Sequence, residues 1–159
     1  MTIIERLRQY KELDPHKIAI IVDDKKYTYG DLYDAILSID INDTSRIVNV
    51  AQTKESPKHI VALIQSQSFV EQLVQWLAGL YTGYIPMVCH NEMDTEYVEE
   101  LARIIAYKGG APLADFGVLT SGTTGRPKPL WRSESSWREF FDIQNDIFHI
   151  NKDTRIFLH

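Results

Sequence analysis

The sequence predicts an α/β fold, with a largely parallel sheet and flanking helices. The first observation is the almost wholly apolar run Ile60–Ile64, which is typical of a strand buried on both faces. The second is an amphipathic helical pattern that begins after Ser68, a good N-cap residue, and loosens at Gly79 and Gly83. The third is another apolar run at Tyr84–Val88. A strand, a helix and a strand in this order predict two parallel strands joined by a right-handed crossover.

Residues 1 to 59 are expected to form smaller elements. Their order is an amphipathic helix over 2–12, hairpin strands over 18–22 and 26–29, a helix from Leu32 to about Ile39, a turn cluster at 42–45, a strand over 47–51 and a polar linker over 52–57. Gly30 is expected to end the second hairpin strand. The helix and hairpin precede the main sheet in the chain.

The elements that follow Val88 continue the α/β alternation. A helix is expected after Asp94, closed by Lys108-Gly109-Gly110, and then a strand over Phe116–Leu119. A longer helix is expected from the N-cap Ser133 to about Phe148, followed by a strand over 154–158.

Composition limits the classes of function. The 159 residues carry 17 basic and 22 acidic side chains, a net charge of −5, with 44% hydrophobic residues, as expected for one domain with its own core. An acidic chain is a poor general nucleic-acid binder, so any anion site must be local. The most apolar stretch, 69–88, is interrupted by Glu71, Gln72 and Gln75, which argues against a membrane span and favours a cytoplasmic protein.

Cys89 and His90 are the first candidates for a reactive or metal-binding pair. One cysteine cannot form an internal disulfide, and two adjacent residues do not complete a tetrahedral metal site. Both are therefore expected to be packing residues, and no metal ligand is predicted.

The segment between the strand ending at Leu119 and the helix beginning at Ser133 carries the predicted chemistry. Its hydroxyls can donate to an anion, its glycines allow successive N–H groups to turn toward one point, and its only charges are Arg126, Lys128 and Arg132. Pro127 fixes the backbone immediately before Lys128. These features predict a polyphosphate site. The predicted nucleotide-binding residues are Thr120, Ser121, Gly122, Thr123, Thr124, Gly125 and Lys128.

A flexible linker and a Walker loop are two other interpretations of this segment. A Ser/Thr/Gly linker requires neither the ordered hydroxyls and glycines nor the following Pro-Lys. A Walker loop requires Gly-x-x-x-x-Gly-Lys-Ser/Thr, whereas Gly122 and Gly125 are three positions apart and Lys128 precedes Pro129. The polyphosphate interpretation is preferred to both.

The run Thr120-Ser-Gly-Thr-Thr-Gly-Arg-Pro-Lys128 resembles the phosphate-binding loop of the adenylate-forming superfamily. That superfamily includes acyl-CoA synthetases, adenylation domains of nonribosomal peptide synthetases and luciferases. Two weaker similarities lie upstream in the expected order, at Lys26–Leu32 and Leu77–Pro86. The resemblance covers about residues 15 to 159.

The resemblance implies that a carboxylate attacks the α-phosphate of Mg-ATP, giving an acyl-adenylate and pyrophosphate, before a thiol such as CoA captures the acyl group. A fatty acid is the first candidate for the small carboxylic acid, followed by an aryl acid or an o-succinylbenzoate-like acid. Thr120, Ser121, Thr123, Thr124 and Lys128 would contact phosphates, and Gly122 and Gly125 would shape the loop. ATP, Mg²⁺ and CoA are the implied cofactors and co-substrate.

The chain also departs from the family pattern, with Pro129 in place of a glycine and Arg132-Ser133-Glu134 in place of a Thr-His pair. Family members usually run to about 500 residues, so residues 1–159 are interpreted as a single partial domain, with no catalytic residue of its own and no activity alone. The alternative is a noncatalytic nucleotide-binding or assembly module. An uncovered sheet edge or an apolar helix face near Trp137, Phe140 and Phe141 is expected to cause self-association.

Overall fold

The structure is a computed structural model that describes residues 1–50, 60–108, 114–120, 127–151 and 154–155. Within these ranges the helices are α1 (Ile3–Leu13), α2 (Tyr29–Ser38), α3 (Ile41–Thr44), α4 (Phe69–Tyr81), α5 (Thr95–Lys108), α6 (Glu134–Arg138) and α7 (Phe141–Phe148). The strands are β1 (Ile18–Val22), β2 (Lys25–Thr28), β3 (Arg46–Asn49), β4 (Ile60–Ile64), β5 (Ile85–Val88), β6 (Phe116–Thr120) and β7 (Lys128–Arg132). The expected linker at 52–57 lies outside the described residues.

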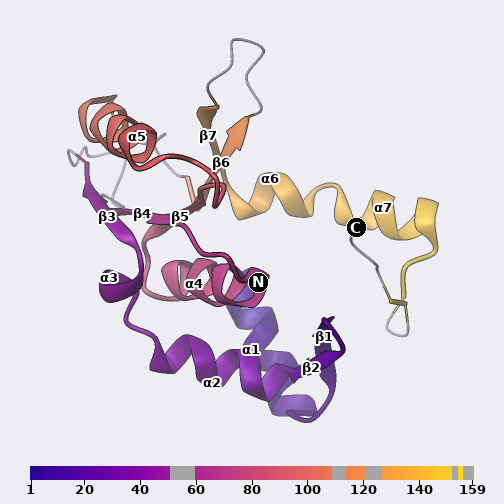
Figure 1. The fold of residues 1–159 in the computed structure, drawn as a ribbon. Coiled ribbons are helices and arrows are strands. Elements are labelled where there is room, and N and C mark those ends of the chain that lie inside the picture. The colour runs from indigo at the N-terminus through magenta and orange to yellow at the C-terminus, as the bar shows by residue number, and fades with distance from the viewer. Residues whose placement is uncertain (51–59, 109–113, 121–126, 152–153, 156–159) are drawn as a thin grey trace.

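The main sheet has five strands in the order β3-β4-β5-β6-β7 (Figure 1). The three central strands β4, β5 and β6 are parallel, and the edge strands β3 and β7 are antiparallel to their neighbours. The predicted α/β class and the strand–helix–strand unit are therefore confirmed. Strands β1 and β2 form a separate antiparallel hairpin, also as predicted.

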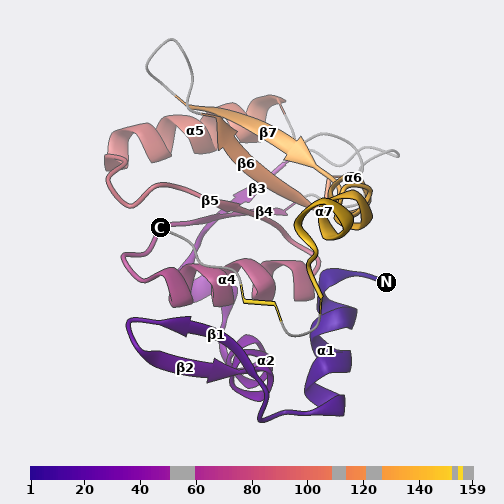
Figure 2. The same ribbon diagram turned by 90° about the vertical axis from the view of Figure 1, so that its right-hand side faces the viewer.

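Helices cover both faces of the sheet. Figure 2 shows α5 on one face and α4 on the other, with α1, α2 and the β1–β2 hairpin beyond α4. On the α5 face, alternate residues of β4 and β5 pack against α5; the buried cluster is Val48, Val50, Val61, Leu63, Ile85, Met87, Cys89, Val98, Leu101, Ala102 and Ile105. A second cluster joins α1, α2 and α4 through Leu7, Leu32, Ile36, Val74, Leu77 and Ala78.

Two glycines allow unusually close packing. A Cβ at Gly79 in α4 would lie 2.9 Å from the Cβ of Pro86, so a side chain there would push α4 away from β5. A Cβ at Gly117 in β6 would lie 2.2 Å from Cε of Met87. That space is filled by Met87 and by the ring of Trp131, which packs against the α5-face cluster.

The first residue of β6 is the centre of an aromatic contact between three elements. Phe116 is 1% exposed, and its ring lies 4.9 Å from that of Trp137 in α6 and 5.4 Å from that of Trp76 in α4, in edge-to-face geometry. Beside it, the buried carboxylate of Glu134 accepts a hydrogen bond from the backbone N–H of Ile3, at 2.7 Å. These contacts fix α6 to both α1 and α4.

The structure corrects two expectations near the N-terminus. Gly30 does not end a strand: Thr28 N-caps α2 in a capping box with Asp31, and Gly30 lies buried inside that helix beside Pro15. The expected turn cluster at 42–45 is mostly the short helix α3, which Asp40 caps.

The long helix expected over 133–148 is wrong as one element. Ser133 caps a helix as predicted, but that helix, α6, ends at Arg138, and α7 begins at Phe141. Trp137 and Glu134 tie α6 to the body, whereas α7 has no buried residue, so tertiary contacts hold only the first part. In the expected strand over 154–158, Thr154 and Arg155 are not in a strand, and 156–158 lie outside the described residues.

Candidate functional site

Of the predicted phosphate-binding residues, Thr120 and Lys128 lie within the described part of the chain. Ser121, Gly122, Thr123, Thr124 and Gly125 lie outside it. Thr120 is the last residue of β6 and Lys128 is the first residue of β7, and the two form the final pair of the antiparallel ladder. The structure therefore brings the two ends of the predicted loop together.

The side chain of Thr120 reinforces this final pair. Its hydroxyl accepts a hydrogen bond from the backbone N–H of Lys128 at 3.3 Å and donates to the carbonyl of Lys128 at 3.4 Å. Strand β7 alternates: Pro129 and Trp131 are half-buried, whereas Lys128, Leu130 and Arg132 are exposed. The ammonium-bearing side chain of Lys128 is therefore on an accessible face.

A cleft of about 750 Å³ lies at the edge of the sheet where the parallel strands end. In α/β folds, the carboxyl ends of parallel strands are the usual place for ligands. The cleft is lined by Gln67, Phe69, Gln72, Val88, Cys89, His90, Asn91, Glu92, Met93, Leu119, Thr120 and Pro127. Thr120 and Pro127, the residue before Lys128, thus border a cleft at the position where this fold class binds its ligands.

Hydrogen bonds hold the turn that follows β5 on one side of this cleft. The amide nitrogen of Gln65 donates to the carbonyls of His90 at 3.1 Å and Met93 at 2.9 Å. The amide of Asn91 donates to the side-chain oxygen of Gln67 at 2.8 Å. These amides are engaged in shaping the cleft wall.

Cys89 and His90 differ in their environments. Cys89 is fully buried, and burial raises the pKa of its thiol to about 11, so the thiol stays protonated at neutral pH and its predicted packing role is confirmed. His90 is exposed and borders the cleft, so its expected packing role is wrong.

The sequence did not predict one contact at the site. The hydroxyl of Tyr97, in the first turn of α5, donates a hydrogen bond to the carbonyl of Pro127. Thirty residues separate the two in the sequence, and no local pattern links them. The contact ties the residue before Lys128 to the helix that covers the sheet.

Two other kinds of site, a metal-binding cluster and a membrane-spanning helix, are not found among the described residues. In these ranges no group of three His, Cys, Asp or Glu side chains is placed to hold a metal ion. In the same part of the chain, no helix has the length and apolar character needed to cross a bilayer.

No family model matches the chain, but individual proteins do. It is 24% identical, over 97% of its length, to a putative long chain fatty acid-CoA ligase VraA of Staphylococcus aureus (strain COL), and 26% identical, over 86%, to the Staphylococcus haemolyticus protein of the same name. The chain spans only about a third of these relatives, 36% and 33% of their lengths.

Solved structures show the same fold. The o-succinylbenzoate CoA synthetase MenE from Bacillus subtilis aligns over 94% of the chain and 37% of its own, with a TM-score of 0.63 and 16% identity. The predicted resemblance to adenylate-forming enzymes is confirmed. The N-terminal subdomain of Klebsiella oxytoca NpsA, in complex with 3-hydroxyanthranilyl-AMSN, aligns over 84% of the chain and 40% of its own, with a TM-score of 0.54 and 17% identity. Like the VraA relatives, these adenylate-forming proteins are matched only in part.

Proposed function

We propose that the chain is the N-terminal portion of an ATP-dependent, acyl-CoA synthetase-like ligase. In the proposed reaction a carboxylate oxygen attacks the α-phosphorus of ATP, the bond to the bridging oxygen breaks, and acyl-adenylate and pyrophosphate form. The observation that carries the proposal is the pairing of Thr120 with Lys128 at the carboxyl edge of the sheet, beside the cleft. The two residues bound a segment with the sequence of a phosphate loop.

The loop is proposed to hold the β- and γ-phosphates. Hydroxyls and an ammonium form charge-assisted hydrogen bonds to phosphate oxygens, and these strengthen as negative charge accumulates on the departing pyrophosphate. Thr120, Ser121, Thr123, Thr124 and Lys128 are the proposed contacts, with Gly122 and Gly125 shaping the backbone. Thr120 and Lys128 fit this role, because both stand at the end of the β6–β7 hairpin that carries the connecting segment, and Lys128 is exposed.

The remaining assignments rest on the resemblance and on the relatives' names. A fatty acid is the proposed substrate because the VraA relatives are named as putative long chain fatty acid-CoA ligases. CoA is the proposed thiol acceptor and Mg²⁺ the proposed metal, with ATP as the nucleotide. Residues 1–159 are proposed to form one partial AMP-binding domain of a cytoplasmic protein that acts after adenylation as an acid–thiol ligase.

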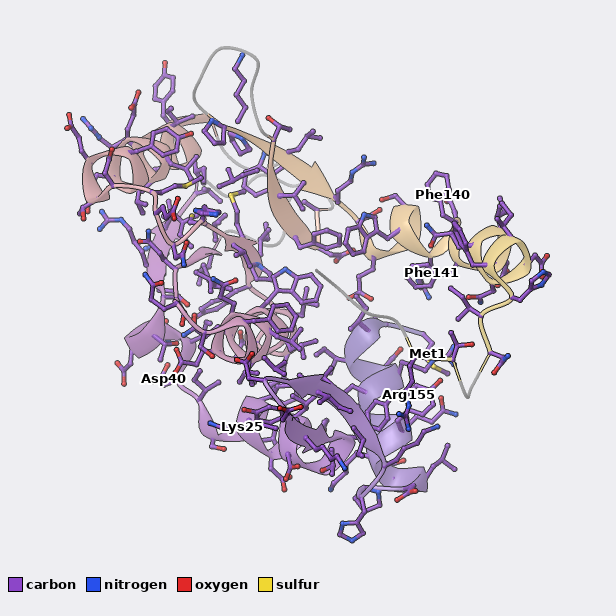
Figure 3. The ribbon with its side chains drawn as sticks, turned by 45° about the vertical axis from the view of Figure 1, so that its right-hand side comes forward. Met1, Lys25, Asp40, Phe140, Phe141 and Arg155 are labelled. Atoms are coloured by element: carbon purple, nitrogen blue, oxygen red, sulfur yellow. The ribbon has the colours of Figure 1, made fainter. Side chains whose placement is uncertain are left out.

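Pyrophosphate exchange into ATP by the full-length protein tests the proposal. Wild-type protein should show exchange that depends on a fatty acid, and Lys128→Ala should lower the rate about 10-fold to 1,000-fold, as expected for loss of one transition-state donor. Lys128→Arg should restore only part, because a planar guanidinium replaces a compact ammonium. Lys25→Ala is the matched control, since Lys25 lies on the β1–β2 hairpin, far from β7 (Figure 3).

Thermal melting of the same preparations separates chemistry from folding. Lys128 is exposed, so its removal should cost less than about 1 kcal/mol of unfolding free energy. A Lys128→Ala protein with wild-type exchange would refute the phosphate role. Full-length protein that binds ATP but exchanges no pyrophosphate with any acid would favour the noncatalytic module. The 159 residues alone should show no exchange.

We also propose that the 159-residue chain by itself self-associates through its α6–α7 arm. Figure 3 shows Phe140 and Phe141 on this arm, away from the sheet. Large apolar side chains at 43–69% exposure lie along it: Trp137, Phe140, Phe141, Ile143, Ile147 and Phe148. Such a surface favours burial against a second copy. Light scattering at about 100 μM should show a dimer or larger species that Ile147→Lys weakens, and a monomer would refute the proposal.

A further inference from the structure

We propose that Tyr97 is a positioning residue that holds the Lys128 arm of the phosphate loop, which is Pro127 and Lys128, against α5. The inference rests on the proposed function, because it assumes that the loop binds phosphate. Nothing in the local sequence around Lys128 indicates this role. It comes from one contact between elements that are 30 residues apart.

The contact joins a well-anchored residue to the backbone beside Lys128. The Tyr97 hydroxyl donates to the carbonyl of Pro127, and the Tyr97 side chain is half-buried. The backbone N–H of Tyr97 is bound in turn by the carboxylate of Asp94, the helix cap, at 2.6 Å. Its neighbours Val98 and Leu101 lie in the buried cluster between α5 and the sheet. Tyr97 is therefore supported by the core of the molecule.

Other hydrogen bonds restrain the Lys128 arm only weakly. Proline has no N–H, so Pro127 and Pro129 cannot donate to any neighbour, and their carbonyls are the only backbone groups that can bind at these two positions. The side-chain bonds between Thr120 and Lys128 are long, at 3.3 and 3.4 Å. Among the described strands, β7 is also an edge strand that pairs only with β6. The Tyr97 bond supplies a tie from outside the hairpin.

Because the bonded carbonyl belongs to the peptide unit that carries the Lys128 N–H, the Tyr97 bond restrains that peptide plane directly. Its orientation sets where the Lys128 side chain leaves the backbone. Losing the hydroxyl should leave the fold intact but allow this plane to rotate. The effect should appear on the phosphate side of the reaction, with the carboxylate side unchanged.

The test uses full-length protein in three variants. Tyr97→Phe removes only the hydroxyl; Tyr97→4-aminophenylalanine restores a donor; Tyr107→Phe is the control, a tyrosine of the same helix that is 91% exposed. Three quantities are measured: the KM for pyrophosphate and the KM for the acid in the pyrophosphate-exchange assay, and the amide hydrogen-exchange rate of Lys128 without ligand. Thermal melting is followed in parallel.

Tyr97→Phe should raise the KM for pyrophosphate about 3-fold to 10-fold, the range expected for one hydrogen bond, and leave the KM for the acid unchanged. It should also accelerate the hydrogen exchange of the Lys128 amide. The amino variant should recover both, and Tyr107→Phe should change neither. The proposal would be overturned if Tyr97→Phe changed neither the hydrogen exchange of the Lys128 amide nor the KM for pyrophosphate. Equal rises in the KM for pyrophosphate and for the acid, with a lower melting temperature, would also overturn it. If wild-type protein shows no pyrophosphate exchange, the proposed function fails, and the Lys128 amide rate alone then decides whether Tyr97 positions this arm.

Discussion

The two ends of strand β6 meet very different surroundings. At its first residue, Phe116 is 1% exposed and lies between the indole rings of Trp76 and Trp137. At its last residue, Thr120 is only partly buried, borders the cleft and pairs with Lys128. Five residues thus run from the centre of the aromatic core to the proposed ligand edge. The buried end supplies stability, and it leaves the other end free to carry polar residues that contribute little to folding.

The largest expected difference comes from placing alanine at each end in turn. Phe116→Ala removes a ring packed between two indoles and should cost about 3–5 kcal/mol of unfolding free energy. Thr120→Ala loses two long hydrogen bonds and should cost about 1 kcal/mol or less. Urea unfolding followed by tryptophan fluorescence measures both. Equal losses of unfolding free energy in the two variants would show that the two ends of β6 contribute equally to stability.

Cys89 lines the cleft but is fully buried, so its reactivity tests whether reagents can reach the residues beneath the cleft surface. Its thiol pKa of about 11, against an ordinary 9.0, reduces the thiolate fraction at pH 8 about 100-fold. As the only cysteine, it should react with a disulfide reagent at pH 8 at least about 100-fold more slowly in native protein than in urea. Rapid reaction of Cys89 in the native protein would mean that the reagent reaches the thiol through the cleft.

The same pKa shift sets a pH dependence of stability. The folded pKa lies above the unfolded value, so the stabilisation is fully present below about pH 9 and is lost as pH rises through about 11. Melting temperatures should therefore fall across this interval, and they should fall less in Cys89→Ala.

Glu134 tests the support of the buried end. Its carboxylate is 8% exposed and accepts the N–H of Ile3, so Glu134→Ala should cost about 1–3 kcal/mol by leaving that group without its acceptor. Glu139→Ala, at an exposed position just after α6, is the control and should stay within about 0.5 kcal/mol of wild type. If both variants melt alike, the Glu134 contact does not support the core.

The smallest effect is expected at an ion pair outside β6. Arg46 of β3 and Glu99 of α5 are 2.5 Å apart, but their side chains are 45% and 42% exposed. Arg46→Ala should cost about 1 kcal/mol or less, and the cost should shrink in 1 M salt. A larger, salt-independent loss would show that stability does not follow burial here as it does along β6.

The central unit of the fold was predictable because its signals are local. Ile60–Ile64 is apolar throughout, Ser68 caps the next helix, and Ile85–Val88 completes the parallel pair. Strand β7 was not predicted, because Pro129 within it lowers any strand preference. An edge strand tolerates proline, since only one side of the strand needs to bond, but being an edge strand is a property of the assembled sheet.

The site was predictable to a similar extent. The hydroxyls, glycines and Lys128 form one short pattern, so a phosphate loop could be proposed from nine residues, and the roles of its seven assigned residues stay a prediction. The cleft lining and the Tyr97–Pro127 bond could not be foreseen, because they join α4, β5, α5 and β6 across the fold. The single helix expected over 133–148 failed for the related reason that its apolar pattern does not say whether anything covers it.

The contact between Ile3 and Glu134 also has a consequence for how the chain is synthesised. Residues 131 apart meet at the first turn of α1, where Arg138 also binds the carbonyl of Met1, beside the local capping box of Thr2 and Glu5. The ribosome makes α1 before α6, so the long-range contacts at the start of α1 cannot form until α6 has left the exit tunnel. With synthesis at roughly 5–20 residues per second, α1 waits about 7–26 seconds for this partner. An extension fused before Met1 would therefore interfere with the docking of α6 onto α1, a late step in the folding of residues 1–159, although it is attached at the opposite end of this stretch.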